Sequence, residues 1–411
     1  MNSLRCRCCQ APLLTSFVDL GKSPLSNAYL LKSDLHKMEP FYPLHVFVCT
    51  DCWLVQLDIF ESPQQIFSEY AYFSSYSESW LKHAKCFVEK VYERFSLGPD
   101  SQVVEVASND GYLLQYFQAI GVPVMGVEPA VNVASVAQNK GIPTRVGFMG
   151  RQLAEDLALE GKRADLLIGN NVFAHVPDLQ DFTSGLAHLL KPQGTLTLEF
   201  PHLLRLIQGT QFDTIYHEHF SYFSLYSASK VLAQHGLIIF DVEELATHGG
   251  SLRVFATHAL SSKSRMTVSP ARILEEERMY GLVQIDTYSS FAENMSSSKR
   301  QLLKFLIDAK EKGKQVVGYG APAKGNTLLN YCGIREDLLS YTVDLNPQKQ
   351  GLYLPGTHIP IYAPEKIKQT QPDYVLVLPW NLIDEIKSQL SFIRSWGGKF
   401  VVPIPCIKII D

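Results

Sequence analysis

The chain has 411 residues, of which 46% are hydrophobic and 19% charged, and 37 basic against 41 acidic side chains give a formal net charge of −4. This is the composition of a globular protein of two or three domains, which excludes disorder, collagen and coiled coil as the main architecture. A protein that binds nucleic acid would carry a basic excess, so no such partner is expected. No apolar stretch reaches the roughly 18 residues of a membrane span. The N-terminus lacks the apolar region of a signal peptide, so we expect a cytoplasmic protein.

Cysteines are concentrated in the first 52 positions. Cys6 and Cys9 form one C-x-x-C pair, and Cys49 and Cys52 form a second. Two such pairs can place four thiolates tetrahedrally around one Zn²⁺, which leaves no open position for water or substrate. We therefore predict a structural zinc site, with buried, reduced cysteines as the alternative. Cys8 lies too close to Cys6 to belong to a standard pair.

The pattern of apolar residues predicts the elements in chain order. Residues 10–65 combine short apolar runs with prolines, which favours a small β-rich module around the metal, and the Tyr- and Ser-rich segment 68–80 is expected to be a loop. From residue 81 a helical period begins, and strand–turn–helix units then alternate up to an antiparallel hairpin of LIIFDVEEL and LRVFATH. Residues 268–312 are expected to be long helices, and a second, smaller alternation starts at about 313. Two such alternations predict two doubly wound α/β domains.

The first glycine-containing turn runs from Glu105 to Gly111. It starts with an acid near the end of a strand and reaches a glycine that lets the chain bend close to a ligand. The next strand ends in Gly126-Val-Glu128, where an acid can accept both hydroxyls of a ribose. Two acids around such a turn suit S-adenosylmethionine (SAM), which has a ribose but no pyrophosphate. A tight turn with a surface acid is the alternative.

The second glycine turn, Gly318 to Ala323, satisfies G-x-G-x-x-A, and Asp344 follows near the end of the next strand. This is the fingerprint of an NAD site. Pro322 removes one N–H donor from the turn, however, and Lys324 adds a cation at a helix N-terminus that would also accept the diphosphate of a nucleotide sugar. An NAD-dependent oxidoreductase or epimerase is therefore the competing enzyme class, and a zinc-module adaptor is a non-enzyme alternative.

A run of titratable side chains occupies Tyr216, His217, Glu218 and His219. Histidine is suited to moving protons near neutral pH. In a strand His217 and His219 would share a face, whereas in a helical turn Tyr216 and His219 would do so. The sequence leaves both arrangements open, together with a hydrogen-bonded core and a His-x-His metal site.

The motifs taken together resemble one family over essentially the whole chain, the sugar C-methyltransferases that act on nucleotide-linked 4-keto-deoxy sugars. Besides the four zinc-type cysteines, the resemblance is carried by VEVASNDGYLL (104–114), GVEPA (126–130), GNNVFAHVPDL (169–179), YHEHFSYFS (216–224), HGGSLRVF (248–255) and GYGAPAKGNTLLNY (318–331).

The resemblance implies an α/β protein of three parts. These are an N-terminal zinc-binding module (1–66), a Rossmann-like SAM methyltransferase core (67–262), and a helical connector with a C-terminal Rossmann-like domain (263–411). It implies SAM and structural Zn²⁺ as cofactors. It also implies a nucleotide sugar of the dTDP-4-keto-deoxyhexose type as substrate, and it disfavours NAD at the second glycine turn. Three domains can bury enough surface for a monomer.

The resemblance also assigns roles to residues. His219 is the expected base, with Tyr216 and Glu218 nearby and His175 as a second proton acceptor. The expected SAM contacts are Glu105, Ser108, Asn109, Asp110, Gly111, Glu128, Asn170 and Asn171, and the expected substrate contacts are Tyr76, His248, Arg253, Lys324 and Asn326. The base would remove the acidic hydrogen beside the C4 ketone, with C3 favoured over other carbons, and a donor or cation would stabilise the enolate oxygen. Methylation of that carbon is a step of deoxysugar biosynthesis. The nucleotide, the stereochemistry and the choice between C3 and C4 stay open.

Overall fold

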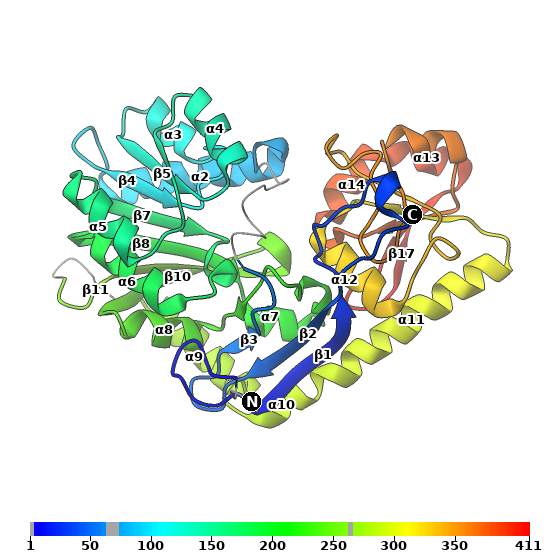
Figure 1. Ribbon diagram of the computed structural model, residues 1–411, viewed down its shortest axis with the longest axis horizontal. Coiled ribbons are helices and arrows are strands. Elements are labelled where there is room, and N and C mark those ends of the chain that lie inside the picture. The colour runs from blue at the N-terminus through cyan, green and yellow to red at the C-terminus, as the bar shows by residue number, and fades with distance from the viewer. Residues whose placement is uncertain (1–3, 63–73, 262–265) are drawn as a thin grey trace.

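The structure is a computed structural model that describes residues 4–62, 74–261 and 266–411. Two α/β units lie side by side, and a small β-sheet and the long helix α11 (Phe291–Glu311) run beneath them (Figure 1). The two boundaries predicted after residues 66 and 262 lie outside the described residues. So does part of the predicted loop 68–80, and α2 (Glu78–Phe95) begins within its last residues.

The larger unit is built on a seven-stranded sheet of order β10-β11-β8-β7-β4-β5-β6. Its parallel strands are β4 (Val103–Val106), β5 (Val124–Glu128), β6 (Thr144–Val146), β7 (Ala164–Asn170) and β8 (Leu190–Pro201). The predicted antiparallel hairpin is confirmed as β10 (Leu237–Leu245) and β11 (Ser251–His258), which closes one edge. The strand order reverses between β4 and β7, and ligands of open α/β sheets bind at the carboxyl ends of the strands at such a point.

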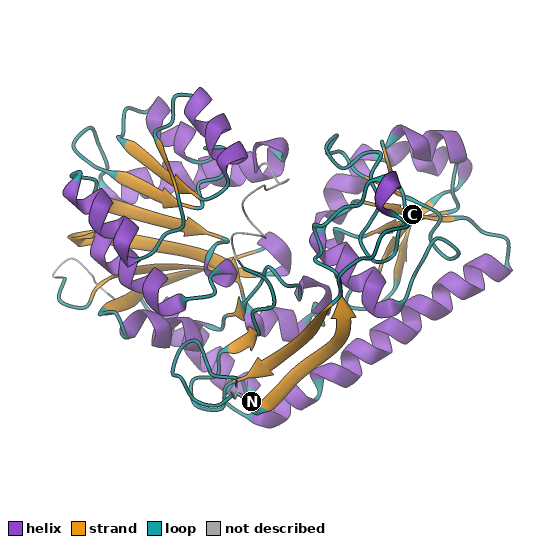
Figure 2. Ribbon diagram, viewed as in Figure 1, coloured by secondary structure: helices purple, strands orange, loops and turns teal. Residues whose placement is uncertain are grey.

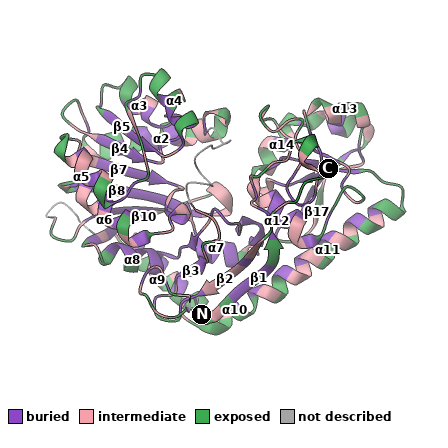
Figure 3. Cartoon of the chain, viewed as in Figure 1, coloured by how far each residue is buried: buried purple, intermediate pink, exposed green. Residues whose placement is uncertain are grey.

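Helices cover both faces of this sheet (Figure 2). They are α2, α3 (Leu114–Ala119), α4 (Val131–Asn139), α5 (Arg151–Leu159), α6 (Leu179–Leu189) and α8 (Leu225–Ala233). The buried residues of α7 (Leu203–Gln208) instead pack in the core shared with the N-terminal module and the smaller unit. The central strands are buried on both sides, as Figure 3 shows, because the helices remove both faces from water. In α2 the buried residues Ala84, Phe87, Val88 and Val91 repeat at the helical period, and the Ser77 hydroxyl caps the first turn by accepting the Trp80 N–H.

The smaller unit contains a six-stranded sheet of order β14-β13-β12-β15-β16-β17, which confirms the predicted second alternation. Its elements are β12 (Val316–Tyr319), α12 (Ala323–Cys332), β13 (Thr342–Val343), β14 (Ile361–Tyr362), α13 (Glu365–Thr370), β15 (Tyr374–Val377), α14 (Ile383–Gln389), β16 (Lys399–Val402) and β17 (Lys408–Ile410). All strands except β17 are parallel. The predicted helical stretch before it forms α9 (Ser269–Tyr280), α10 (Ile285–Ser289) and α11.

The N-terminal module is the predicted β-rich element, with antiparallel strands β1 (Thr15–Ser23), β2 (Tyr42–Val48) and β3 (Val55–Leu57). Phe17 stacks on Phe291 of α11 with ring centres 4.7 Å apart. The sequence did not predict the fourth strand, β9 (Ser221–Tyr222), which follows the titratable run and pairs with β3. No helix of the described ranges is long and apolar enough to cross a membrane.

Candidate active site

The two C-x-x-C pairs meet in space. The sulfur atoms of Cys6, Cys9, Cys49 and Cys52 all lie within 4.8 Å of one another. The Cys6–Cys52 and Cys9–Cys49 sulfurs are 3.4 and 3.5 Å apart. Tetrahedral zinc–thiolate bonds require sulfur separations of about 3.8 Å, so the residues fit one structural Zn²⁺.

Each pair forms a turn, here called a knuckle, with the same backbone conformation. The Gln10 N–H donates to the Cys6 carbonyl and the Trp53 N–H donates to the Cys49 carbonyl, both at 2.9 Å. Gln10 and Trp53 adopt φ values of 64° and 59°, which turn the chain back so that both sulfurs of a pair reach the metal position. Cys8 is buried but lies outside the four-sulfur group.

A cleft of about 510 Å³ lies where the three parts of the chain meet. Its walls come from the carboxyl ends of β4, β5 and β7, from the segment 214–219, from residues 322–324 before and within α12, and from Asn27 of the N-terminal module. A ligand in this cleft would contact all three parts at once.

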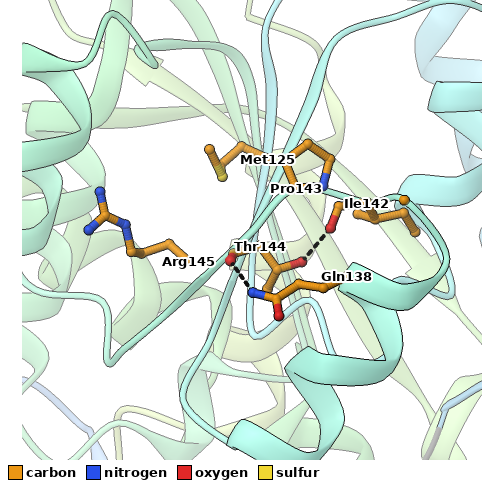
Figure 4. A pocket seen from close by; sticks show the side chains of 7 residues that line it. Met125, Gln138, Ile142, Pro143, Thr144 and Arg145 are labelled. Carbon is orange, nitrogen blue, oxygen red and sulfur yellow. Dashed lines mark hydrogen bonds between the residues drawn. The ribbon is translucent and has the colours of Figure 1, made fainter.

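A second hollow, of about 440 Å³, lies beside β5 and β6 (Figure 4). The Gln138 amide donates to the Thr144 carbonyl, and the Thr144 hydroxyl donates to the Ile142 carbonyl, each at 3.0 Å. Its lining contains no acid, histidine or cysteine. The chemistry therefore belongs to the first cleft.

Glu128 ends β5 at the wall of the cleft. Its two carboxylate oxygens accept the N–H groups of Asn109 and Ala130, each at 2.9 Å. Burial raises the pKa of Glu128, and the two backbone N–H groups oppose that rise. Ala107 and Asn109 of the facing turn adopt φ values of 56° and 50°, a strained conformation that brings the backbone to the cleft.

Four of the predicted SAM contacts in this turn are buried and do not line the cleft: Glu105, Ser108, Asp110 and Gly111. Burial raises the pKa of Glu105 well above its ordinary value. A Cβ on Gly111, where φ is 76°, would meet the Ile142 side chain at 2.3 Å. These residues shape the turn, whereas Asn109 and Glu128 line the cleft, where they can contact a ligand.

Asn170 ends β7, Asn171 follows it, and both line the cleft. The side-chain oxygen of each is buried and has no hydrogen-bond partner among the described residues. An unpaired buried acceptor costs about 1–3 kcal/mol, so both sites favour a ligand that brings donors. The ribose hydroxyls and the ammonium group of SAM are such donors, so Glu128 and the two asparagines fit this cofactor.

The titratable run forms a turn, in which Tyr216 and His219 lie together. The His219 N–H donates to the Tyr216 carbonyl at 2.9 Å. The His219 Nδ1–H donates to the Thr214 carbonyl, and the Tyr216 hydroxyl donates to His219 Nε2, both at 2.9 Å. Because a carbonyl can only accept, the proton is on Nδ1 and the lone pair is on Nε2. Burial, and secondarily His175, lower the pKa of His219 well below its ordinary value, so the imidazole is neutral.

Two further imidazoles line the same cleft. The ring of His175 lies edge-on to His219, with ring centres 4.7 Å apart. Burial lowers the pKa of His175 and of His248 to about 4 each, so both are neutral at pH 7. His248 adopts a φ of 54°, which adds another strained residue to the cleft.

Glu218 and His217 point to different surroundings. Glu218 lines the cleft, and its Oε1 accepts the Asn27 side-chain N–H at 2.6 Å. Burial raises the pKa of Glu218 to about 7 against the opposing effects of Asn27 and Lys349. His217 lies outside the cleft, 3.2 Å from the Pro43 carbonyl in the N-terminal module.

Two lysines reach the cleft from the smaller unit. Lys324 Nζ lies 4.7 Å from the centre of the Trp380 ring and donates to Asn381 at 2.6 Å. Lys349 donates to the Ala321 carbonyl at 2.9 Å. Both lie near the N-terminus of α12, and they provide the cleft with cations.

The structure does not bring three of the predicted substrate contacts to the cleft lining. Tyr76 is 62% exposed. Arg253 is buried and forms an ion pair with Glu199 at 2.6 Å. Asn326 is buried and donates to the Ser26 carbonyl at 2.6 Å, so it joins the N-terminal segment to α12.

Sequence reasoning missed several lining residues, among them Asn27, Trp80 and Lys349. Trp80 stacks on His83 and meets His248 edge-on, with ring centres 4.9 and 5.6 Å apart. These residues belong to no motif, and only the fold brings them together.

In the segment that matches the NAD fingerprint, the Asp344 carboxylate is already bonded to backbone N–H groups of the protein. The Ala321 N–H donates to Asp344 Oδ2 at 2.7 Å, and Asp344 Oδ1 accepts the Asn346 N–H at 2.8 Å. The acid expected to bind a ribose is thus held by the backbone of the turn that would bind the pyrophosphate. This arrangement disfavours a dinucleotide.

Known families match all three parts of the chain. Residues 6–67 match a zinc binding domain, residues 80–241 a methyltransferase domain, and residues 246–405 the C-methyltransferase C-terminal domain. The C-methyltransferase NovU of Streptomyces niveus is 37% identical over 99% of this chain and 96% of its own length.

Other relatives match less of the chain. A ubiquinone biosynthesis O-methyltransferase of Bartonella bacilliformis is 30% identical over 25% of this chain and 42% of its own. The solved magnesium protoporphyrin IX methyltransferase of Synechocystis PCC 6803, with bound SAH, covers 43% of this chain and 82% of its own at 19% identity and a TM-score of 0.34.

Proposed function

Because the chain belongs to the family of SAM-dependent C-methyltransferases, we propose that it methylates C3, the carbon beside the C4 ketone, of a nucleotide-linked 4-keto-deoxy sugar. The observation that carries the proposal is the neutral His219, whose Nε2 lone pair lies at the cleft that Glu128, Asn170 and Asn171 also line. A dTDP-linked deoxyhexose is the proposed substrate, and deoxysugar biosynthesis the proposed pathway.

The chemistry starts with a proton transfer. A hydrogen beside a ketone is acidic enough for a positioned base to remove. Once the Tyr216 hydroxyl turns away from His219 Nε2, this nitrogen accepts the proton and leaves an enolate. The Thr214 carbonyl then holds the Nδ1–H of the resulting imidazolium. SAM, when bound, supplies an electrophilic methyl group to the nucleophilic carbon. Tyr216 and His175 border the base, and His175 is the second candidate for its role.

The enolate oxygen needs a hydrogen-bond donor or a cation. We propose that protonated Glu218 provides the donor. Its Oε2 is buried and has no hydrogen-bond partner among the described residues, and its pKa of about 7 keeps a substantial protonated fraction at neutral pH. Glu218 does not orient His219, because Thr214 and Tyr216 form the hydrogen bonds to the two ring nitrogens of His219.

The nucleotide diphosphate is proposed to lie toward the smaller unit. A helix N-terminus attracts anions, and α12 begins at the cleft with Lys324 in its first turn. Lys349 is the second cation of this wall. Because the Asp344 carboxylate already accepts the Ala321 and Asn346 N–H groups, it is not available for the ribose of NAD, which favours a nucleotide sugar beside α12.

The role of Glu218 predicts a pH dependence. Its raised pKa means that the donor is present below about pH 7 and lost as the pH rises through that value, so turnover should fall on this alkaline side. Glu218→Gln keeps an N–H donor at all pH values, so this limb should disappear. Asn27→Leu removes a hydrogen bond that stabilises the carboxylate and should move the limb to higher pH. The measurement is kcat against pH at saturating substrate, and an unchanged limb in Glu218→Gln would remove Glu218 from the role.

Calorimetry tests the choice of cofactor. Zinc-loaded protein is titrated separately with S-adenosylhomocysteine and with NAD⁺. We expect micromolar binding of the first and none of the second. Binding of NAD⁺ alone would contradict the proposal and would move the chemistry to redox or epimerase steps at residues 318–323.

A further inference from the structure

Arg7 lies inside the first zinc knuckle, between Cys6 and Cys8, but its side chain leaves the knuckle. Its Nη1 donates to the Phe220 carbonyl at 2.8 Å, and its Nη2 donates to the Leu57 carbonyl. The guanidinium also lies 5.6 Å from the centre of the Phe220 ring. Arg7 therefore links the knuckle to the residue that directly follows His219.

The Phe220 peptide is held from two sides. Its carbonyl accepts the Leu57 N–H at 3.0 Å in addition to Arg7, and its N–H donates to the Ala174 carbonyl at 2.8 Å. Ala174 precedes His175, so Phe220 connects the segment that carries His219 to the segment that carries His175. A shift of the Phe220 carbonyl would move His219 relative to the substrate.

The first zinc knuckle is itself held in place by hydrogen bonds from three glutamine side chains. Gln180 Nε2 donates to the carbonyls of Arg7 and Cys8 at 3.1 and 3.0 Å, and Gln234 Nε2 donates to the Cys8 carbonyl at 3.2 Å. Gln56 accepts the Arg7 backbone N–H at 2.9 Å and donates to the Cys6 sulfur at 3.1 Å. The metal-binding turn is thus fixed both to the larger α/β unit and to β3.

We propose that Arg7 is a positioning residue, through which the zinc knuckle holds the turn that carries His219. The inference rests on the proposed function, because it assumes that His219 is the base. A hydrogen bond from a charged donor to a carbonyl is geometrically demanding, and misplacing a catalytic group by about 1 Å can cost up to about 100-fold in rate. Zinc would then contribute to catalysis only through the chain that it orders.

The test compares Arg7→Met, Arg7→Lys and the control Arg5→Met. Arg5 also belongs to the N-terminal module, but its side chain donates to the Gln10 carbonyl within the knuckle and does not reach the turn. Steady-state kinetics give kcat and the substrate KM, calorimetry gives the affinity for S-adenosylhomocysteine, and metal analysis gives the zinc content. For Arg7→Met we expect kcat to fall about tenfold or more, with zinc content, cofactor affinity and KM near wild type. Arg7→Lys should recover part of the loss, since an ammonium group can still donate to the Phe220 carbonyl, and Arg5→Met should match wild type.

Each other outcome overturns the inference. A wild-type kcat in Arg7→Met would show that the contact does not position the base. Loss of zinc or of cofactor binding would make Arg7 a general structural residue, and an equal fall of kcat in Arg5→Met would assign the effect to the knuckle as a whole. Failure of the proposed function is distinguishable, because the wild-type protein would then methylate no ketosugar nucleotide.

Discussion

Replacing His219 by asparagine should lower turnover by about 100-fold or more, because positioned proton transfer contributes at least that much to such reactions. Asparagine can still donate to the Thr214 carbonyl in place of Nδ1–H, but it has no group at the position of Nε2. The affinity for S-adenosylhomocysteine should stay near wild type, because Glu128, Asn170 and Asn171 are untouched. Steady-state kinetics and calorimetry measure the two quantities.

His217→Asn is the matched control for this variant. It removes an imidazole from the same turn, but that imidazole contacts the Pro43 carbonyl and lies outside the cleft. Its turnover should stay within a few-fold of wild type. Wild-type turnover in His219→Asn would exclude His219 as the base, and His175→Asn would then be the next variant to measure.

Cys49→Ser should abolish zinc binding and strongly destabilise the protein. Structural zinc sites contribute about 10–16 kcal/mol of binding free energy in zinc-finger peptides, and this energy is available to folding only when all ligands are present. Wild-type protein should contain about one zinc per chain. Metal analysis and thermal unfolding provide the measurements.

Two other cysteines serve as controls for the zinc site. Cys86 is exposed on α2 and Cys8 lies outside the four-sulfur group, so Cys86→Ser and Cys8→Ser should both retain zinc. Loss of zinc from Cys8→Ser would show that the set of ligands is not the four cysteines proposed. A fully folded wild-type protein without zinc would contradict a structural metal altogether.

Local patterns predicted those parts of the fold that depend on neighbouring residues. The C-x-x-C spacing predicts knuckles, the buried runs of β4 and β7 predict strands of a covered sheet, and the spacing in α2 predicts its buried face. Each is a short-range consequence of backbone geometry. The hairpin β10–β11 follows in the same way from two apolar runs close in sequence.

Contacts between distant segments were not predictable in this way. The pairing of β9 with β3, the bond between Asn27 and Glu218, and the position of Lys349 depend on how three parts of the chain pack together. For the same reason, a side chain that belongs to a family motif can stabilise the fold instead of lining the cleft. Burial alone would raise the pKa of Glu199, but the hydrogen bond from His83 and the charge of the Arg253 guanidinium lower it to about 2.

The conformation of the titratable run, residues 216–219, could not be predicted from the sequence for a different reason. A strand and a turn place different pairs of these side chains together, and the local sequence fits both. The tertiary bonds of Phe220 to Ala174 and Leu57 select the turn. That selection brings Tyr216 and His219 within 2.9 Å of each other.

The most direct test of the central claim follows a labelled methyl group. The zinc-loaded protein is incubated with methyl-deuterated SAM and a panel of nucleotide-linked 4-keto-deoxy sugars, and mass spectrometry and NMR locate the label in the product. We expect the deuterated methyl group on C3, beside the ketone, with the nucleotide intact. A label on an oxygen or nitrogen atom, or methylation only of sugars that lack the ketone, would contradict carbon methylation through an enolate.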